Sequence, residues 1–242
     1  MLNYIRGEFY RLLRKKSMYM YFGLVAVLYF LLAFMRSNTF TEETIVLDAQ
    51  MFSRFFPVLL GGFLFTAIYT DDLNSKNLIS LVGFGLSKMK IVVSKLILTA
   101  LFSLIIFGFI LLLHLAIFRL LGWSVTADAL TTISASFVKY LLATIAYSVL
   151  SGIVVYGLQR TTFAVVLYIV FAFDIAGSLI GGAVASYAPY LSDYLMTNIT
   201  TNIMVGIESG SDLAMPIVLY IIFVAVAAVL SALAFTKKEM EF

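Results

Sequence analysis

Six long apolar blocks dominate the hydrophobic pattern of the chain. They lie near residues 18–35, 50–69, 91–118, 134–158, 162–182 and 216–235. A helix needs roughly 20 apolar residues to cross the ~30 Å hydrocarbon layer of a bilayer. The alternation of apolar and polar residues that a membrane β-barrel requires is absent, and backbone groups in lipid must be bonded internally. The pattern therefore predicts an all-α, polytopic membrane protein with six transmembrane helices.

Cationic side chains between the blocks predict the orientation of these helices. Only 12% of the residues are charged, but twelve Lys and Arg residues fall in the connections of one side and two in those of the other. Membrane proteins keep their Lys/Arg-rich connections in the cytosol. We therefore expect a multi-pass protein of the plasma (inner, cytoplasmic) membrane with both termini cytosolic. The cytosolic set is Arg6, Arg11, Arg14, Lys15, Lys16, Lys76, Lys88, Lys90, Lys95, Arg160, Lys237 and Lys238, against Arg36 and Arg119 outside.

Residues 1–16 have the pattern of an amphipathic helix that precedes the first span. Apolar and charged side chains recur on opposite faces at helical spacing, which is typical of a helix lying in the membrane interface. The alternative is that the five cations of this segment only enforce orientation. No linker or internal repeat divides the rest of the chain, so we expect residues 1–242 to form a single transmembrane domain. The apolar face carries Leu2, Ile5, Phe9, Leu12 and Leu13.

The connection over residues 70–95 is too apolar for a solvated loop and too short to cross the membrane. Asp71, Asp72, Asn74 and Ser75 offer capping side chains for a short helix. Gly83 and Gly85 then permit a turn, and Ser87 starts a helix that runs into the third span. The sequence predicts a short cytosolic helix with one apolar side, suited to docking onto a partner. The alternative is an ordinary interfacial connector.

This arrangement resembles the type-2 export permeases of ABC transporters. The similarity consists of an amphipathic helix, two spans, an acidic residue, a short helix and a Gly-to-Ser-Lys run into the third span. It extends over nearly the whole chain in topology and suggests the subgroup for export of, or immunity to, bacteriocins and peptide toxins. The family more often has Glu at the acidic position, which leaves open whether Asp71 or Asp72 is equivalent. The residues that carry the resemblance are Asp71, Asp72, Lys76, Asn77, Leu78, Gly83, Leu86, Ser87, Lys88 and Lys95.

The resemblance implies a role for residues 73–83 as the coupling helix that contacts a cytosolic ABC ATPase subunit. It also implies that two permease chains pair, either two copies of this chain or this chain with a close relative. Spans one, two and five would line the path at their interface. The residues expected to couple to the ATPase are Asp71, Asp72, Lys76, Leu78, Ile79, Leu81, Val82 and Lys88.

Several chemical classes are excluded by the residues that the chain lacks. No G-x-x-x-x-G-K-[ST] phosphate loop occurs, so Mg-ATP is expected on the partner ATPase and no cofactor on this chain. With one His and no Cys, a metal site is not expected. We therefore do not expect the chain to be an enzyme by itself, and we expect no nucleic acid among its partners.

Asp174 lies inside the fifth block, where an ionised side chain is costly. Arg54, His114 and Lys139 fall near the same, outer ends of their spans. One hypothesis is a polar cluster of Asp174 with Lys139, Arg54 or His114. The alternative, favoured for these three, is that Arg54 and Lys139 extend to the interface and His114 makes a local hydrogen bond. Asp174 is too short to reach the interface, so we expect a buried partner for it.

Aromatic residues are abundant in the first two spans, and Pro57 is expected to kink the second. Aromatic surfaces adapt to varied ligands, although packing and lipid contact are the commoner roles. The outer connection 183–214 is half apolar and predicts short interfacial or re-entrant helices. The expected substrate path contains Phe22, Tyr29, Phe55, Phe56 and Asp174.

The sequence thus predicts the permease subunit of an ATP-driven exporter, moving an amphipathic peptide or other hydrophobic substrate out of the cell or membrane. An ion-coupled transporter or channel that uses Asp174 is the main alternative. Inverted repeats would favour it, and none is found. A non-transporting membrane scaffold is the third possibility.

Overall fold

The structure is a computed structural model that describes residues 1–35, 41–74, 77–120, 122 and 125–237. The regular elements in these ranges are all helical, which confirms the predicted all-α fold. Arg36, Ser75, Lys76 and Lys238, which entered the predictions above, lie outside the described residues. In chain order the elements are α1 (Leu2–Leu13), α2 (Lys16–Met35), α3 (Glu42–Arg54), η1 (Pro57–Gly61), α4 (Gly62–Phe65), η2 (Thr66–Thr70), α5 (Asp71–Asn74), α6 (Asn77–Gly83), α7 (Lys88–Leu120), α8 (Ala127–Leu158), α9 (Thr161–Ala172), α10 (Ile175–Tyr187), η3 (Pro189–Tyr194), α11 (Met196–Ser209) and α12 (Ala214–Lys237).

Long apolar helices build the bundle. Within the described residues, four are long and apolar enough to cross a membrane: Glu42–Thr70, Lys88–Leu120, Ala127–Leu158 and Ala214–Lys237. The bent pair α9–α10 makes a fifth if it counts as one span. The first predicted block forms α2, whose apolar stretch Lys16–Leu31 is shorter. A multi-pass helical protein is thereby confirmed, and the number of six spans stays a prediction.

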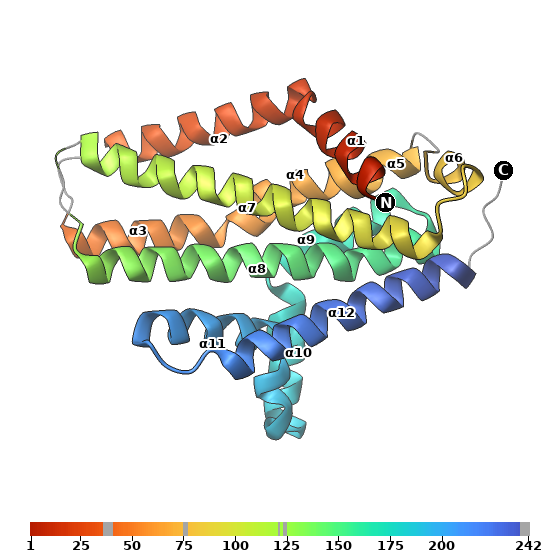
Figure 1. The fold of residues 1–242 in the computed structure, drawn as a ribbon. Helices are drawn as coiled ribbons and strands as arrows, with labels where there is room; N and C mark the ends of the chain where they lie inside the picture. The colour runs from red at the N-terminus through yellow and green to blue at the C-terminus, as the bar shows by residue number, and fades with distance from the viewer. Residues whose placement is uncertain (36–40, 75–76, 121, 123–124, 238–242) are drawn as a thin grey trace.

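The helix α8 lies at the centre of the bundle, in contact with α3, α7, α9, α11 and α12 (Figure 1). Figure 1 shows α2 at one edge, beside α7, and α10 projecting away from the bundle. The N-terminus, α6 and the last turns of α12 lie together, on the right of the view. This part is called the α6 end below. The last turns of α2 and of α7 and the first turns of α3 and α8 lie at the opposite end.

The second span is longer than its apolar block, because the helix begins at Glu42 instead of near residue 50. Thr41 caps it by a reciprocal pair of hydrogen bonds with Thr44. The added turns are amphipathic, with Ile45 and Ala49 buried, so a search for continuous apolar residues does not detect them. At Pro57 the span becomes π-helical over Pro57–Gly61, consistent with the missing backbone N–H of proline.

The fifth block, expected as one span near 162–182, forms two helices bent by 60°. The bend lies at Asp174, which has a left-handed backbone conformation with φ of 58°. Asp and Asn adopt this conformation at lower cost than most residues with a Cβ. Between α10 and α12 the chain forms η3 and α11, the kind of short helices expected for the connection 183–214.

Candidate functional site

The helix α1 is joined to the rest of the α6 end by ion pairs. Lys95 of α7 donates to Glu8 at 2.8 Å, and Lys15, in the turn between α1 and α2, pairs with Asp71 at the start of α5. Arg11 also donates to Glu8, at 2.8 and 3.1 Å. Burial tends to raise the pKa of Glu8, but the hydrogen bond from Arg11 and the charge of Lys95 outweigh it and hold the pKa below its ordinary value. The amphipathic helix predicted for residues 1–16 is therefore present over Leu2–Leu13 and fixed to α5 and α7.

The helix α6 ends in a Schellman motif that sets the turn before α7. Gly85 has a left-handed φ of 83°, Leu86 N–H donates to Leu81 C=O at 3.1 Å, and Gly85 N–H donates to Val82 C=O at 2.9 Å. The carbonyl of Ser87 accepts the first hydrogen bond of α7, from Ile91. The predicted turn and helix start are thus observed. Phe84, at the tip of this turn, is 87% exposed.

The apolar side of α6 faces the bundle. Leu78 is only 5% exposed, and Leu81 and Val82 pack against the same buried cluster. Lys88 is directed to α12, where it donates to Phe235 C=O at 2.9 Å and lies over the Phe235 ring. The sequence predicts that this apolar face is suited to docking onto a partner, whereas in the structure Leu78, Leu81 and Val82 pack against the bundle. Their role in coupling to an ATPase stays a prediction. Of the remaining predicted coupling residues, Asp72 lies in α5, Ile79 in α6, and Lys76 outside the described residues.

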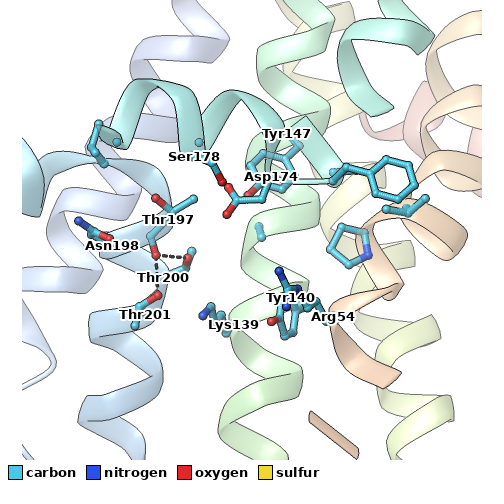
Figure 2. Close-up of a pocket in the computed structure, with 18 of the residues that line it drawn as sticks. Arg54, Lys139, Tyr140, Tyr147, Asp174, Ser178, Thr197, Asn198, Thr200 and Thr201 are labelled. Atoms are coloured by element: carbon cyan, nitrogen blue, oxygen red, sulfur yellow. Dashed lines mark hydrogen bonds between the residues drawn. The ribbon is translucent and has the colours of Figure 1, made fainter. Parts of the chain in front are cut away.

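A cavity of about 900 Å³ lies at the bend between α9 and α10. Its walls come from α3, η1, α8, α10, η3 and α11, and it contains Asp174 together with Arg54 and Lys139 (Figure 2). This is called the Asp174 cavity below. Three residues of the polar-cluster hypothesis therefore line the same cavity. The favoured alternative, that Arg54 and Lys139 extend to the membrane interface, stays a prediction. The further lining is apolar or hydroxyl-bearing, including Phe55, Pro57, Tyr140, Tyr147, Ser178, Thr197, Asn198, Thr200 and Thr201.

Gly177 makes room for the carboxylate at the bend. A Cβ built at this glycine would lie 2.0 Å from Oδ1 of Asp174 and 2.9 Å from Cγ2 of Thr197. No hydrogen bond to that Oδ1 is found among the described residues, although the atom is buried. The buried partner expected for Asp174 is thus not among them. α11, whose polar residues Thr197, Asn198, Thr200 and Thr201 interrupt an apolar connection, was the element that sequence reasoning did not assign to a site.

His114 lies apart from this cavity. Its ring is 1% exposed and packs edge-on against Phe118, with centroids 4.2 Å apart, and near Tyr29 and Phe137. Neither ring nitrogen has a hydrogen-bond partner among the described residues, so both the predicted local hydrogen bond and the alternative placement with Asp174 are wrong. The reason is that the neighbouring turns of α7, α2 and α8 offer aromatic rings at this depth.

The five residues of the predicted substrate path divide into two groups. Phe55 and Asp174 line the Asp174 cavity. Phe56 is fully buried among Phe107 and Phe137, Tyr29 packs on Phe52, and Phe22 packs on Phe63. The structure therefore brings two of the five together. Within the described residues, no cluster of three or more His, Asp or Glu could hold a metal ion.

Comparison with known proteins agrees with this architecture. The family model described as ABC-2 family transporter protein matches residues 4–177, from α1 through the bend at Asp174. No curated protein sequence matches the chain. The matched region is well over half of the chain and contains most of α1, all of α6 and the long helices α7 and α8. The chain therefore belongs to the ABC-2 family of transporter proteins and is a multi-pass membrane permease of the ABC exporter type.

Proposed function

We propose that the chain is the transmembrane subunit of an ATP-driven exporter, with Mg-ATP bound and hydrolysed on a separate cytosolic ABC ATPase. The observation that supports this most directly is the construction of the α6 end. There the ion pair Glu8–Lys95 joins α1 to α7, and the pair Lys15–Asp71 joins the turn after α1 to α5, near the turn at Phe84. A force applied to this turn would be carried into the 33-residue helix α7, instead of being absorbed by a loose connection.

The same end is proposed to face the cytosol, with both termini, in a plasma membrane. Exposed cations at this end support the orientation: Arg6, Arg14, Lys16, Lys90, Arg160 and Lys237. A second permease chain, either identical or closely related, is proposed to pack against the bundle. The exposed apolar surface of α2 is compatible with such a contact or with lipid, and it includes Leu24, Val27, Leu28 and Leu31.

An amphipathic peptide or another hydrophobic molecule is the proposed substrate class. Support comes from the aromatic and apolar surfaces that the first two spans expose, including Tyr19, Phe30, Phe34 and Phe55. The ion-coupled alternative finds no support in the family match.

Co-purification tests this proposal. The permease is produced with the nucleotide-binding subunits of its host, and we expect one of them to remain bound through affinity purification. Candidate peptides are then added to the complex in liposomes, and the rate of ATP hydrolysis is measured. A peptide that is transported should raise this rate. Robust peptide transport in liposomes without any ATPase would refute the proposal, as would a purified permease that binds none of the ATPase subunits.

A further inference from the structure

The Asp174 cavity contains ionisable side chains of both signs that are not paired directly with one another among the described residues. Asp174 lies at the bend beside Tyr147, while Lys139 and Arg54 lie across the cavity, on α8 and α3 (Figure 2). Among the described residues, none of the three forms an ion pair, and the buried Oδ1 of Asp174 accepts no hydrogen bond. Charged groups at membrane depth ordinarily meet a counter-charge or water. This cavity therefore has one negative and two positive sites open to a bound molecule.

The helix α11 adds hydrogen-bond acceptors to the same cavity. The hydroxyl of Thr200 donates to C=O of Met196 and Thr197, at 3.1 and 3.0 Å, and that of Thr201 donates to Thr197 C=O at 2.7 Å. Because each hydroxyl has a single proton, its oxygen can offer only lone pairs to a ligand. Together with Oδ1 of Asp174, these oxygens suit a ligand group that carries several N–H donors.

Apolar surface continues from the cavity along α10. This helix has no buried side chain, and it contributes Gly177, Gly181 and Ala185 to the cavity wall. Its residues Leu179 and Ile180 are exposed, 71% and 50% respectively. In a bilayer such a surface lies against acyl chains or another apolar chain. A charged recess beside an apolar helix matches an amphiphile with a polar headgroup.

We propose that the Asp174 cavity binds a phospholipid whose headgroup carries a phosphate and a primary ammonium. Arg54 and Lys139 would hold the phosphate, since cations pair strongly with phosphate oxygens. Asp174 and the α11 hydroxyls would accept hydrogen bonds from the ammonium. A trimethylammonium headgroup has no N–H to donate, and a glycerol headgroup has no positive charge for Asp174. A volume of about 900 Å³ is large enough for the headgroup and the adjoining glycerol region. The proposal does not depend on which substrate is exported.

Native mass spectrometry of the full-length chain in detergent tests this site. Phosphatidylethanolamine, phosphatidylcholine and phosphatidylglycerol with identical acyl chains are titrated separately, and the apparent affinity of the first bound lipid is measured. For the unmodified chain we expect tighter binding of phosphatidylethanolamine than of the other two lipids. In Asp174→Asn this preference over phosphatidylglycerol should fall by about tenfold, because one charge-assisted hydrogen bond is lost. In Lys139→Gln and Arg54→Gln the affinities for phosphatidylethanolamine and for phosphatidylglycerol should both fall.

Matched variants separate the site from general effects. Asp128→Asn and Arg119→Gln remove exposed charges that do not line the cavity, and they should bind as the unmodified chain does. Gly177→Ala keeps the charge of Asp174 but displaces its carboxylate, so this variant should lose the preference for phosphatidylethanolamine over phosphatidylglycerol. Gly182→Ala places its new Cβ with no atom within 4 Å, so it should keep that preference. This glycine pair decides the question if Asp174→Asn fails to fold. Equal binding of the three lipids to the unmodified chain, or a preference unchanged in both Asp174→Asn and Gly177→Ala, would overturn the proposal.

Discussion

Lys95, in the second turn of α7, donates a hydrogen bond to Glu8 of α1 at 2.8 Å, across 87 positions of sequence. The lysine side chain is 1% exposed and the glutamate side chain 13%. The ammonium also lies 5.7 Å from the centre of the Tyr4 ring. An N-terminal helix that periodicity alone would place loosely on the membrane surface is thus fixed to α7 by a nearly buried charge pair.

Replacing Glu8 with Gln should destabilise the protein, because it leaves the Lys95 ammonium buried without its carboxylate. Breaking a buried pair by removing one partner costs about 3–5 kcal/mol, and the partial exposure of Glu8 favours the lower end. Thermal unfolding of the purified chain measures the change. Lys90→Gln, which removes an exposed cation of the same helix, is the control and should melt as the unmodified chain does. The double variant Glu8→Gln with Lys95→Met should recover part of the loss, and no recovery would show that the pair is not the cause.

The same pair should make the docking of α1 sensitive to acid. The pKa of Glu8 in the folded protein lies below its ordinary value of 4.5. Its contribution to stability is therefore fully present above the unfolded pKa and is lost as the pH falls through the lower, folded pKa. The chain has no cysteine, so a spin label at Leu13→Cys reports on α1 alone. We expect the label to become more mobile as the pH falls through the folded pKa of Glu8. The same label in a Glu8→Gln background should show no such transition. An identical transition in the two proteins would contradict the assignment of the transition to Glu8.

Gly61 and Gly62 offer a matched test of packing in the second span. A Cβ at Gly61 would lie 2.1 Å from the hydroxyl of Tyr168 and 2.7 Å from Cγ2 of Thr144, whereas a Cβ at Gly62 would be 3.8 Å from its nearest neighbour. The Tyr168 hydroxyl is held in place, because it donates to Pro57 C=O at 2.8 Å. Gly61→Ala should therefore lower the free energy of unfolding by about 1–3 kcal/mol through overpacking. Gly62→Ala should be neutral or slightly stabilising in the same denaturation experiment, and equal effects of the two would refute the proposed contact.

Sequence patterns predicted those features that depend on one segment at a time. The apolar blocks located the helices because lipid requires a continuous run of apolar residues, and Gly85 located the turn because few residues adopt a positive φ. Features that depend on several segments were only partly predictable. The Asp174 cavity combines residues from α3, α8, α10 and α11, and nothing in the local pattern assigned Thr200 or Thr201 to it. Similarly, the bend at Asp174 interrupts a block whose hydropathy is continuous.

The buried face of α6 and the exposed turn that follows it should respond differently to substitution. Leu78 is 5% exposed against the bundle and Phe84 is 87% exposed at the tip of the turn. Leu78→Ala creates a cavity and should lower the free energy of unfolding by about 2–5 kcal/mol. Phe84→Ala removes no buried contact and should leave unfolding unchanged. If the α6 end docks onto an ATPase, an exposed aromatic side chain is the type of residue that anchors such an interface, and its truncation should weaken the complex by at least about tenfold.

Two measurements on the same variants separate these effects. Thermal unfolding of the isolated permease reports on packing, and the binding of the co-purified ATPase subunit to immobilised permease reports on docking. Met89→Ala, on an exposed residue of the adjacent first turn of α7, tests how far the contact surface extends. Lys237→Gln, at the same end but on α12, is the control and should change neither quantity. Normal ATPase binding by Phe84→Ala, together with loss of binding by a folded Leu78→Ala, would mean that the apolar side of α6 turns outward to meet the partner, and that the packing against the bundle belongs to the free subunit.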